Sequence, residues 1–190
     1  MDSLALLKRE GVGLGSARTP VRVLGIDLGT TNSTVGEILW EPGQSGAVEV
    51  RCLEIDQDTT EGRYTHVLVP SVVALHQGNV YTGEGAKRLR ARAADLGLEE
   101  ARNLFCECKN DIGIKRTYHR APRGFQWAAE VGGHVLRFLK DSATSESLVP
   151  VDRVVVTVPA SFQAAQRHDT LKAAELAGIP LGSGDLLDLL

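Results

Sequence analysis

The residues best suited to chemistry lie in the stretch Val23–Gly36, which reads VLGIDLGTTNSTVG. Asp27 ends an apolar run, and a carboxylate held there can bind a hydrated Mg²⁺ ion, which prefers oxygen ligands and keeps several waters. Gly29 lets the backbone come close to a ligand. Backbone N–H groups and the hydroxyls of Thr30 and Thr31 can then point at phosphate oxygens. The turn therefore predicts a site for nucleotide phosphates and a metal, with an ordinary polar hairpin turn as the alternative.

Strands on both sides must hold this turn in place. Val21–Leu28 is rich in aliphatic and β-branched residues, Asn32–Trp40 reads as its antiparallel neighbour, and Gly46–Ile55 follows as a third strand. Three consecutive strands argue against a Rossmann order, in which a helix follows the first strand. Arg153–Pro159, RVVVTVP, is almost wholly apolar, which predicts a central strand buried on both faces.

Helical patterns and short strands fill the rest of the chain. Residues 67–83, VLVPSVVALHQGNVYTG, predict two short strands joined at a Gln-Gly-Asn turn. The pair Gly132-Gly133 lies inside an apolar helical pattern, where it lowers helix propensity and permits close packing. The remaining expected elements are helices over Glu84–Leu96, Glu99–Ile112, Phe125–Ala143 and Phe162–Ala177 and a strand that begins at Leu186.

The composition is that of an ordinary globular protein. The 190 residues are 43% hydrophobic and 24% charged with a net charge of −3, so nothing favours a nucleic acid or a membrane surface as partner. No apolar run approaches the ~20 residues that a bilayer span needs. Three cysteines make no disulfide framework, which favours a reducing compartment such as the cytoplasm. Residues 1–20 lack the order and length of a secretory signal, and we expect them to form a flexible extension.

Widely separated stretches together resemble one family. GIDLGTTNSTVG is similar to the first phosphate motif of the actin-like ATPase superfamily. VVVTVPASFQAAQRHDTLKAAELAGI, residues 154–179, resembles the segment that follows the buried strand in DnaK-type chaperones, the seventy-kilodalton heat-shock family. YTGEGAKR and NLFCECKNDIG are similar to that family's glycine-alanine-lysine helix and its lysine-bearing helix. The resemblance covers roughly residues 22–188.

The resemblance implies an α/β fold, namely a ribonuclease-H-like lobe of an actin-like ATPase with a mixed five-stranded sheet and helices. Its first three strands should be antiparallel, and Val154–Val158 should lie parallel beside the first strand. Residues 21–190 would form this first lobe, with a small inserted subdomain at about residues 57–115. Only KRTYHRAPRG stands where the family carries a β-rich insert, so this second subdomain should be much reduced.

The resemblance also implies roles for individual residues. In the family, a lysine in the position of Lys109 reaches the γ-phosphate and the attacking water, where its charge stabilises phosphoryl transfer. Without the family it reads as an ordinary solvated lysine. Pro159 and Arg167 match residues that relay nucleotide state to the substrate-binding region. The implied catalytic residues are Asp27, Thr30 and Lys109, the implied nucleotide-binding residues are Gly29, Thr30, Thr31, Asn32 and Lys109, and Asp27 would hold Mg²⁺ through water.

The implied function is that of the N-terminal part of the ATP-binding domain of a DnaK-like chaperone of the stress response, with ATP and Mg²⁺ as cofactors. Its partners would be ATP or ADP and, through other parts of the protein, unfolded polypeptides and co-chaperones. Ser161 and Ala164 depart from the family's aromatic and acidic residues, and Leu189 and Leu190 stand where the family places a Glu-Pro-Thr-type motif. We expect an open groove, very weak ATP binding and no useful turnover from these 190 residues alone.

Two other classes of protein share part of the pattern. A sugar or acetate kinase lobe also carries GIDxGTT, but VPASFQAAQR does not resemble those kinases. A non-catalytic binding module could keep the fold without turnover. A nucleotide titration would separate such a module from the lobe of an ATPase.

Overall fold

The computed structural model describes residues 19–43, 48–180 and 186–189. Nearly all of the predicted N-terminal extension, the first two residues of the third predicted strand and Leu190 lie outside these described residues. In the described part of the chain, no helix is long and apolar enough to cross a membrane.

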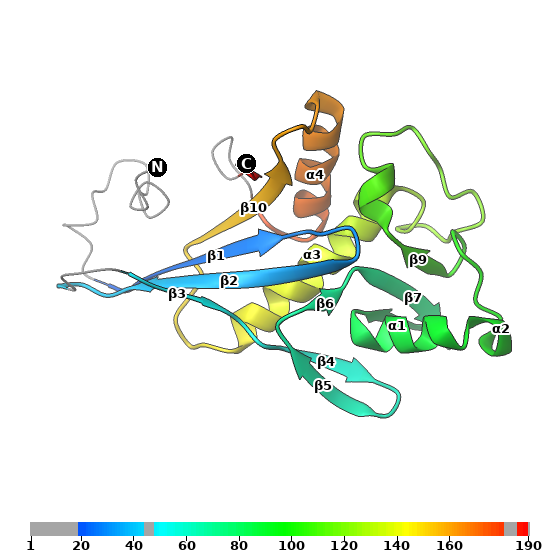
Figure 1. Ribbon diagram of the computed structural model, residues 1–190, viewed down its shortest axis with the longest axis horizontal. Helices are drawn as coiled ribbons and strands as arrows, with labels where there is room; N and C mark the ends of the chain where they lie inside the picture. The colour runs from blue at the N-terminus through cyan, green and yellow to red at the C-terminus, as the bar shows by residue number, and fades with distance from the viewer. Residues whose placement is uncertain (1–18, 44–47, 181–185, 190) are drawn as a thin grey trace.

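A mixed sheet forms the centre of the molecule (Figure 1). Five of its strands follow the order β11-β10-β1-β2-β3, and the short strand β6 pairs with β2 beside β3. Neighbours among the first three strands are antiparallel, as predicted. The strands are β1 (Val21–Asp27), β2 (Asn32–Trp40), β3 (Glu49–Cys52), β6 (Val69–Pro70), β10 (Arg153–Pro159) and β11 (Leu186–Leu189).

Strand β10 lies parallel beside β1, which confirms the predicted placement of Val154–Val158. The register sets Asp27 opposite Thr157 of β10 and opposite Thr34 of β2. Leu24, Ile26 and Val156 have no exposed surface. Because buried aliphatic side chains gain most when a sheet is covered, these strands take the central positions and fix where β1 ends.

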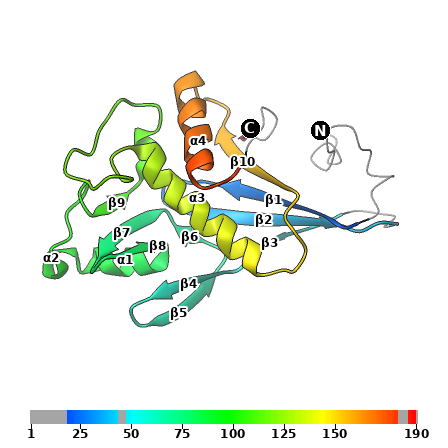
Figure 2. The same cartoon turned by 180° about the vertical axis from the view of Figure 1, so that it is seen from behind.

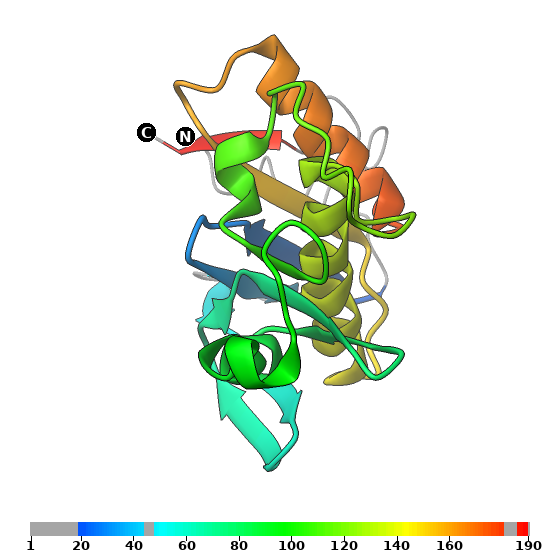
Figure 3. The ribbon, with the colours of Figure 1, turned by 90° about the vertical axis from the view of Figure 1, so that its right-hand side faces the viewer.

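Two helices pack side by side against one face of this sheet (Figures 2 and 3). They are α3 (Ala128–Ser145) and α4 (Ala164–Leu176), each beginning two or three residues after the predicted start. A Cβ atom on Gly133 would lie 3.1 Å from both the carbonyl oxygen of Ala173 and the Cβ of Leu176. The glycine therefore permits the close approach of α3 and α4, which is a case of the close packing predicted for the Gly132-Gly133 pair.

A second group of elements lies along one side of the main sheet (Figure 1). It contains a three-stranded sheet in the order β8-β7-β9, a separate β4-β5 hairpin and two short helices. The elements are β4 (Ile55–Thr59), β5 (Gly62–His66), β7 (Val72–His76), β8 (Asn79–Thr82), α1 (Glu84–Ala91), α2 (Ala93–Leu96), β9 (Leu104–Cys106) and the 3₁₀ turn η3 (Cys108–Asp111).

The predicted helix Glu99–Ile112 is wrong. Leu104–Cys106 pairs antiparallel with β7, with Phe105 opposite Val73, and the chain reaches Lys109 only after Glu107 adopts a φ of +53°. The helix-forming composition of this segment was overridden because the edge of β7 offers hydrogen bonds and Phe105 is buried there. The lysine therefore sits on a single 3₁₀ turn instead of a long helix.

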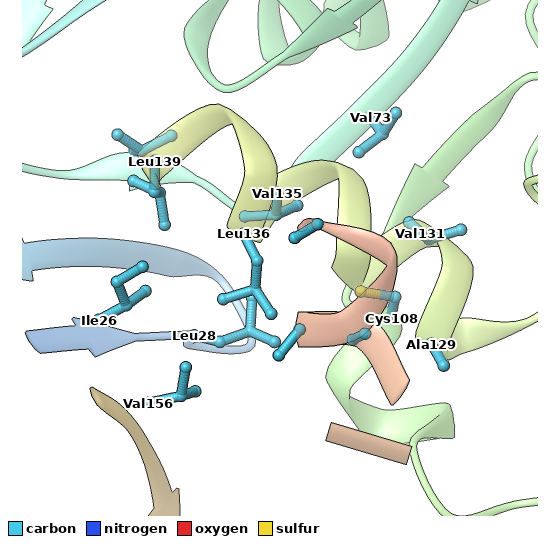
Figure 4. Close-up of a cluster of buried hydrophobic side chains, with 14 of the residues drawn as sticks. Ile26, Leu28, Val73, Cys108, Ala129, Val131, Val135, Leu136, Leu139 and Val156 are labelled. Atoms are coloured by element: carbon cyan, nitrogen blue, oxygen red, sulfur yellow. The ribbon is translucent and has the colours of Figure 1, made fainter. Parts of the chain in front are cut away.

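The segment from Gly113 to Trp127, described throughout, contains neither helix nor strand and connects η3 to α3. The main core nevertheless joins the central strands of the main sheet, β7, β9, η3, α3 and α4. Figure 4 shows Leu28 from the end of β1 near Leu136 of α3, with Cys108 of η3 at the same cluster. Leu28 and Cys108 are each 2% exposed. The core thereby positions the turn after β1 and the turn that carries Lys109.

Candidate functional site

The turn between β1 and β2 has a backbone shape that only glycine allows at its second position. A Cβ atom on Gly29 would lie 1.9 Å from the carbonyl oxygen of Asn32, far inside van der Waals contact. Leu28, the residue before Gly29, is buried in the main core. The turn therefore cannot shift to make room for a Cβ atom on Gly29 without unpacking the Leu28 side chain. A tight turn thus follows β1, and the close approach of a ligand at Gly29 stays a prediction.

Two buried serines brace this turn. The N–H of Gly29 donates to Ser33 Oγ at 3.1 Å, and Ser71 Oγ donates to the Gly29 carbonyl at 2.8 Å. The two hydroxyls lie 2.9 Å apart, and since Ser71 uses its proton on Gly29, Ser33 donates between them. The Ser71 N–H also donates to the Thr31 carbonyl at 2.9 Å. Ser33 lay inside the quoted motif, whereas nothing in the sequence indicated Ser71.

Asp27 is held by a residue of the neighbouring strand. Thr157 Oγ1 donates to Asp27 Oδ1 at 3.0 Å, as their paired positions in β1 and β10 allow. No described residue donates to Asp27 Oδ2, and the side chain is half-buried. One carboxylate oxygen is therefore oriented by the protein while the other can accept from a water on a metal ion.

The remaining polar groups of the turn face outward. Thr30 is half-buried, and Thr31 and Asn32 are exposed at the mouth of the turn. Hydroxyls on a fixed turn, together with its backbone N–H groups, are a kind of donor set that can bind phosphate oxygens. The site is thus open to solvent on this side.

Lys109 projects from η3 onto an aromatic ring. Its ammonium nitrogen lies 5.7 Å from the centroid of Phe162, and the side chain is half-buried. Figures 1 and 3 both place the short green turn of η3 next to the turn between β1 and β2. The predicted residues thus come from segments that lie side by side, although they are far apart in sequence.

Other side chains stabilise the 3₁₀ turn that carries Lys109 through hydrogen bonds that do not involve the lysine itself. Tyr118 donates to Asp111 at 2.7 Å, and Arg116 makes two hydrogen bonds to the same carboxylate. Burial, and then the bond to Asp111, raises the pKa of Tyr118, so its hydroxyl stays protonated and donating. Burial raises the pKa of the Cys108 thiol to about 12, which leaves that thiol unreactive.

Pro159 and Arg167 meet at the same aromatic residue. The N–H of Phe162 donates to the Pro159 carbonyl at 3.0 Å, and Arg167 Nε donates to the Phe162 carbonyl at 3.1 Å. Gln163 and Gln166 close the start of α4 with a reciprocal pair of hydrogen bonds. Phe162, which the sequence analysis gave no role, thus contacts the predicted phosphate lysine and both predicted relay residues.

The order of the mixed sheet, with β10 parallel beside β1 and a braced glycine turn after β1, defines the class as a lobe of the actin-like ATPase fold. Residues 23–181 match the family model described as Hsp70 protein. The chain therefore belongs to the Hsp70 family. This membership favours the DnaK-type interpretation over a sugar or acetate kinase lobe.

Individual relatives agree with this family. The chain is 33% identical over 157 residues to the chaperone protein DnaK of Metamycoplasma hominis, covering 83% of this chain and 22% of that protein. It is 31% identical over 188 residues to the HscA homologue of Acinetobacter baumannii, covering 93% and 28%. It is 30% identical over 181 residues to the mitochondrial heat shock protein SSC3 of Saccharomyces cerevisiae, covering 86% and 26%. The chain thus spans about a quarter of the length of these relatives.

Proposed function

We propose that the turn after β1, together with Lys109, forms the phosphate and metal side of an Hsp70 nucleotide site. The observation that carries this proposal is the braced turn itself. Gly29 has no room for a side chain, and Ser33 and Ser71 fix both of its peptide groups. A polar turn so firmly held, yet exposed at Thr31 and Asn32, suits a ligand that needs many fixed donors.

Each residue then has a distinct role. Asp27, oriented by Thr157, accepts from water on Mg²⁺, and the bound ion would supply charge neutralisation at the phosphates. The backbone N–H groups from Thr30 to Asn32 and the two threonine hydroxyls hold phosphate oxygens. Lys109 provides positive charge at the terminal phosphate and orients the attacking water. Such positioning and electrostatic stabilisation account for most of the catalysis of phosphoryl transfer.

The wider activity belongs to the longer kind of protein that the relatives represent. In that setting we propose slow Mg²⁺-dependent ATP hydrolysis in the cytoplasm, coupled to unfolded polypeptides and co-chaperones. Pro159 and Arg167 would carry the nucleotide state onward. Their contacts with Phe162 support this proposal, because they connect the start of α4 to the residue that supports Lys109.

Calorimetry of the 190-residue chain with Mg²⁺ and ATP tests the proposed site. We expect a Kd on the order of 1 mM, because contacts to phosphates alone leave the base in water. Binding should require Mg²⁺ and should be lost in Lys109→Ala but kept in Lys115→Ala, an exposed lysine six residues along. No Mg²⁺-dependent binding, or equal binding by the two variants, would contradict the proposal.

The same experiment also tests the expectation for the chain alone. Steady phosphate release should be undetectable above the uncatalysed rate. Micromolar affinity, or phosphate release that Lys109→Ala abolishes, would show that these 190 residues form a competent ATPase by themselves.

A further inference from the structure

Phe162 occupies a defined position under the ammonium group of Lys109. The nitrogen lies 5.7 Å from the ring centroid, within the ~6 Å over which an aromatic face attracts a cation. The ring is half-buried and packs against the main core. Its backbone is fixed at both the N–H and the carbonyl, by Pro159 and Arg167. The ring is therefore a rigid platform for a flexible lysine.

No carboxylate neutralises this lysine in the described part of the chain. The nearest acidic residues in sequence are otherwise occupied, since Asp111 accepts from Tyr118 and Arg116, and Glu107 accepts from Asn110. Asp169 of α4 accepts from the N–H of Gly113 at 2.8 Å, which fastens the end of η3 to α4. The acidic groups thus hold the turn in place and leave the ammonium charge free.

We propose that Phe162 is the positioning residue for Lys109. Its ring face holds the ammonium at the groove without cancelling its charge, which an ion pair with a carboxylate would do. This inference rests on the proposed function, because the uncancelled charge is what a phosphate group would meet. Because Phe162 is hydrogen-bonded to Pro159, a movement of the turn between these two residues would also move the ring that holds the Lys109 ammonium.

The contact has a spectroscopic signature that a purely structural role would not produce. In a chain labelled with ¹³C at lysine, the ε-methylene protons of Lys109, assigned by Lys109→Arg, should resonate upfield because the ammonium nitrogen bonded to this methylene lies over the ring of Phe162. Phe162→Leu should return them to the random-coil position, and Phe162→Tyr should keep the shift. Phe138→Leu is the matched control, since Phe138 is also half-buried against the same core, whereas the ammonium of Lys109 lies over the ring of Phe162.

A second substitution keeps the packing and changes only the electrostatics. Pentafluorophenylalanine at position 162 has nearly the same shape but a ring face that no longer attracts cations, so it should release Lys109 even if Phe162→Leu fails to fold. Phe162→Leu and pentafluorophenylalanine at position 162 should each weaken the binding of Mg²⁺ and ATP by about five- to tenfold. Phe138→Leu should leave this binding unchanged.

The two proposals fail in different ways. A response of Lys109 to Mg²⁺ and ATP without any ring-dependent shift would overturn the role of Phe162 and leave the proposed function standing. A ring-dependent shift that Mg²⁺ and ATP do not perturb in the unsubstituted chain would overturn the proposed function. Equal effects of Phe162→Leu and Phe138→Leu on Lys109 would also overturn the positioning role.

Discussion

At the scale of single residues, Gly29 gives the sharpest prediction. A methyl group there meets the Asn32 carbonyl at 1.9 Å, so Gly29→Ala must open the turn. We expect a loss of about 1–3 kcal/mol in the free energy of unfolding and no measurable binding of Mg²⁺ and ATP. Gly25→Ala is the matched control, because no atom lies within 4 Å of a Cβ at that position of β1. Urea unfolding and calorimetry of both variants decide this, and equal behaviour would refute our account of the turn.

The orientation of Asp27 by Thr157 makes a second prediction at this scale. Thr157→Val removes the 3.0 Å hydrogen bond and keeps the shape of the side chain. We expect weaker Mg²⁺-dependent ATP binding by roughly threefold to tenfold, since a bond to a charged group contributes about 1.5 kcal/mol. Thr34→Val, on the opposite neighbour of Asp27 in β2, should bind normally. If both variants bind alike, the Thr157 contact has no role in metal placement.

At the scale of elements, the contact between α3 and α4 distinguishes two adjacent glycines. A Cβ on Gly132 would meet Ala173 Cβ at an ordinary 3.6 Å, whereas one on Gly133 would meet backbone at 3.1 Å. Gly132→Ala should raise the free energy of unfolding by up to about 1 kcal/mol through helix propensity. Gly133→Ala should lower it by about 1–2 kcal/mol, because the backbone of α4 cannot yield without moving the helix. Thermal unfolding of the pair measures the difference, and a stabilising Gly133→Ala would contradict it.

A buried ion pair joins the sheet to the end of α3 and gives a prediction about pH. Arg22 Nε donates to Glu37 at 2.5 Å, and Arg22 also donates to the carbonyls of Ala143 and Val149. Burial raises the pKa of Glu37, but hydrogen bonds and charge from Arg22 and Arg51 outweigh it and hold the pKa below 4.5. The stabilisation is therefore present above pH 4.5 and is lost as pH falls through the lower pKa of the folded state.

Glu37→Gln tests this linkage. At pH 7 it should cost about 3–5 kcal/mol, because Arg22, with no exposed surface, keeps its charge without a carboxylate. The difference from the unsubstituted chain should begin to shrink below pH 4.5, where Glu37 becomes protonated in the unfolded state, and should be lost below the lower pKa of the folded state. Urea unfolding at several pH values measures it. A difference that stays constant down to pH 3 would show that the charge of Glu37 contributes nothing.

At the scale of the whole molecule, prediction from sequence succeeded where local pattern and tertiary structure agree. The apolar run at Val154–Val158 is buried most completely at the centre of a sheet, and β10 lies there beside β1. The antiparallel pairing of β1 with β2 follows from the short polar turn between them. The helix predicted at Glu99–Ile112 failed because pairing with β7 decides its conformation. The β4–β5 hairpin was missed although Ile55 and Gln57 alternate with exposed residues before a Thr-Glu-Gly turn.

In the candidate site, too, local sequence predicts some residues while tertiary contacts decide others. Asp27 and Gly29 could be predicted because one short stretch carries them. Ser71 and Phe162 could not, because each gains its role only when a distant segment folds against the turn or the lysine. The predicted boundaries of the inserted subdomain, at residues 57–115, remain a prediction. Val69, Val73 and Cys108 from this range share the main core with Leu28.

The central claim is that the turn after β1 and Lys109 surround one metal-bound phosphate group. Paramagnetic relaxation by Mn²⁺ in place of Mg²⁺ tests it most directly, since carboxylate and water also suit Mn²⁺. With ATP present, we expect the ion to broaden the amide signals from Gly29 to Asn32 and the ε-methylene signals of Lys109 together, and Asp27→Asn should remove both effects. Broadening of the turn without Lys109, or of neither, would contradict it.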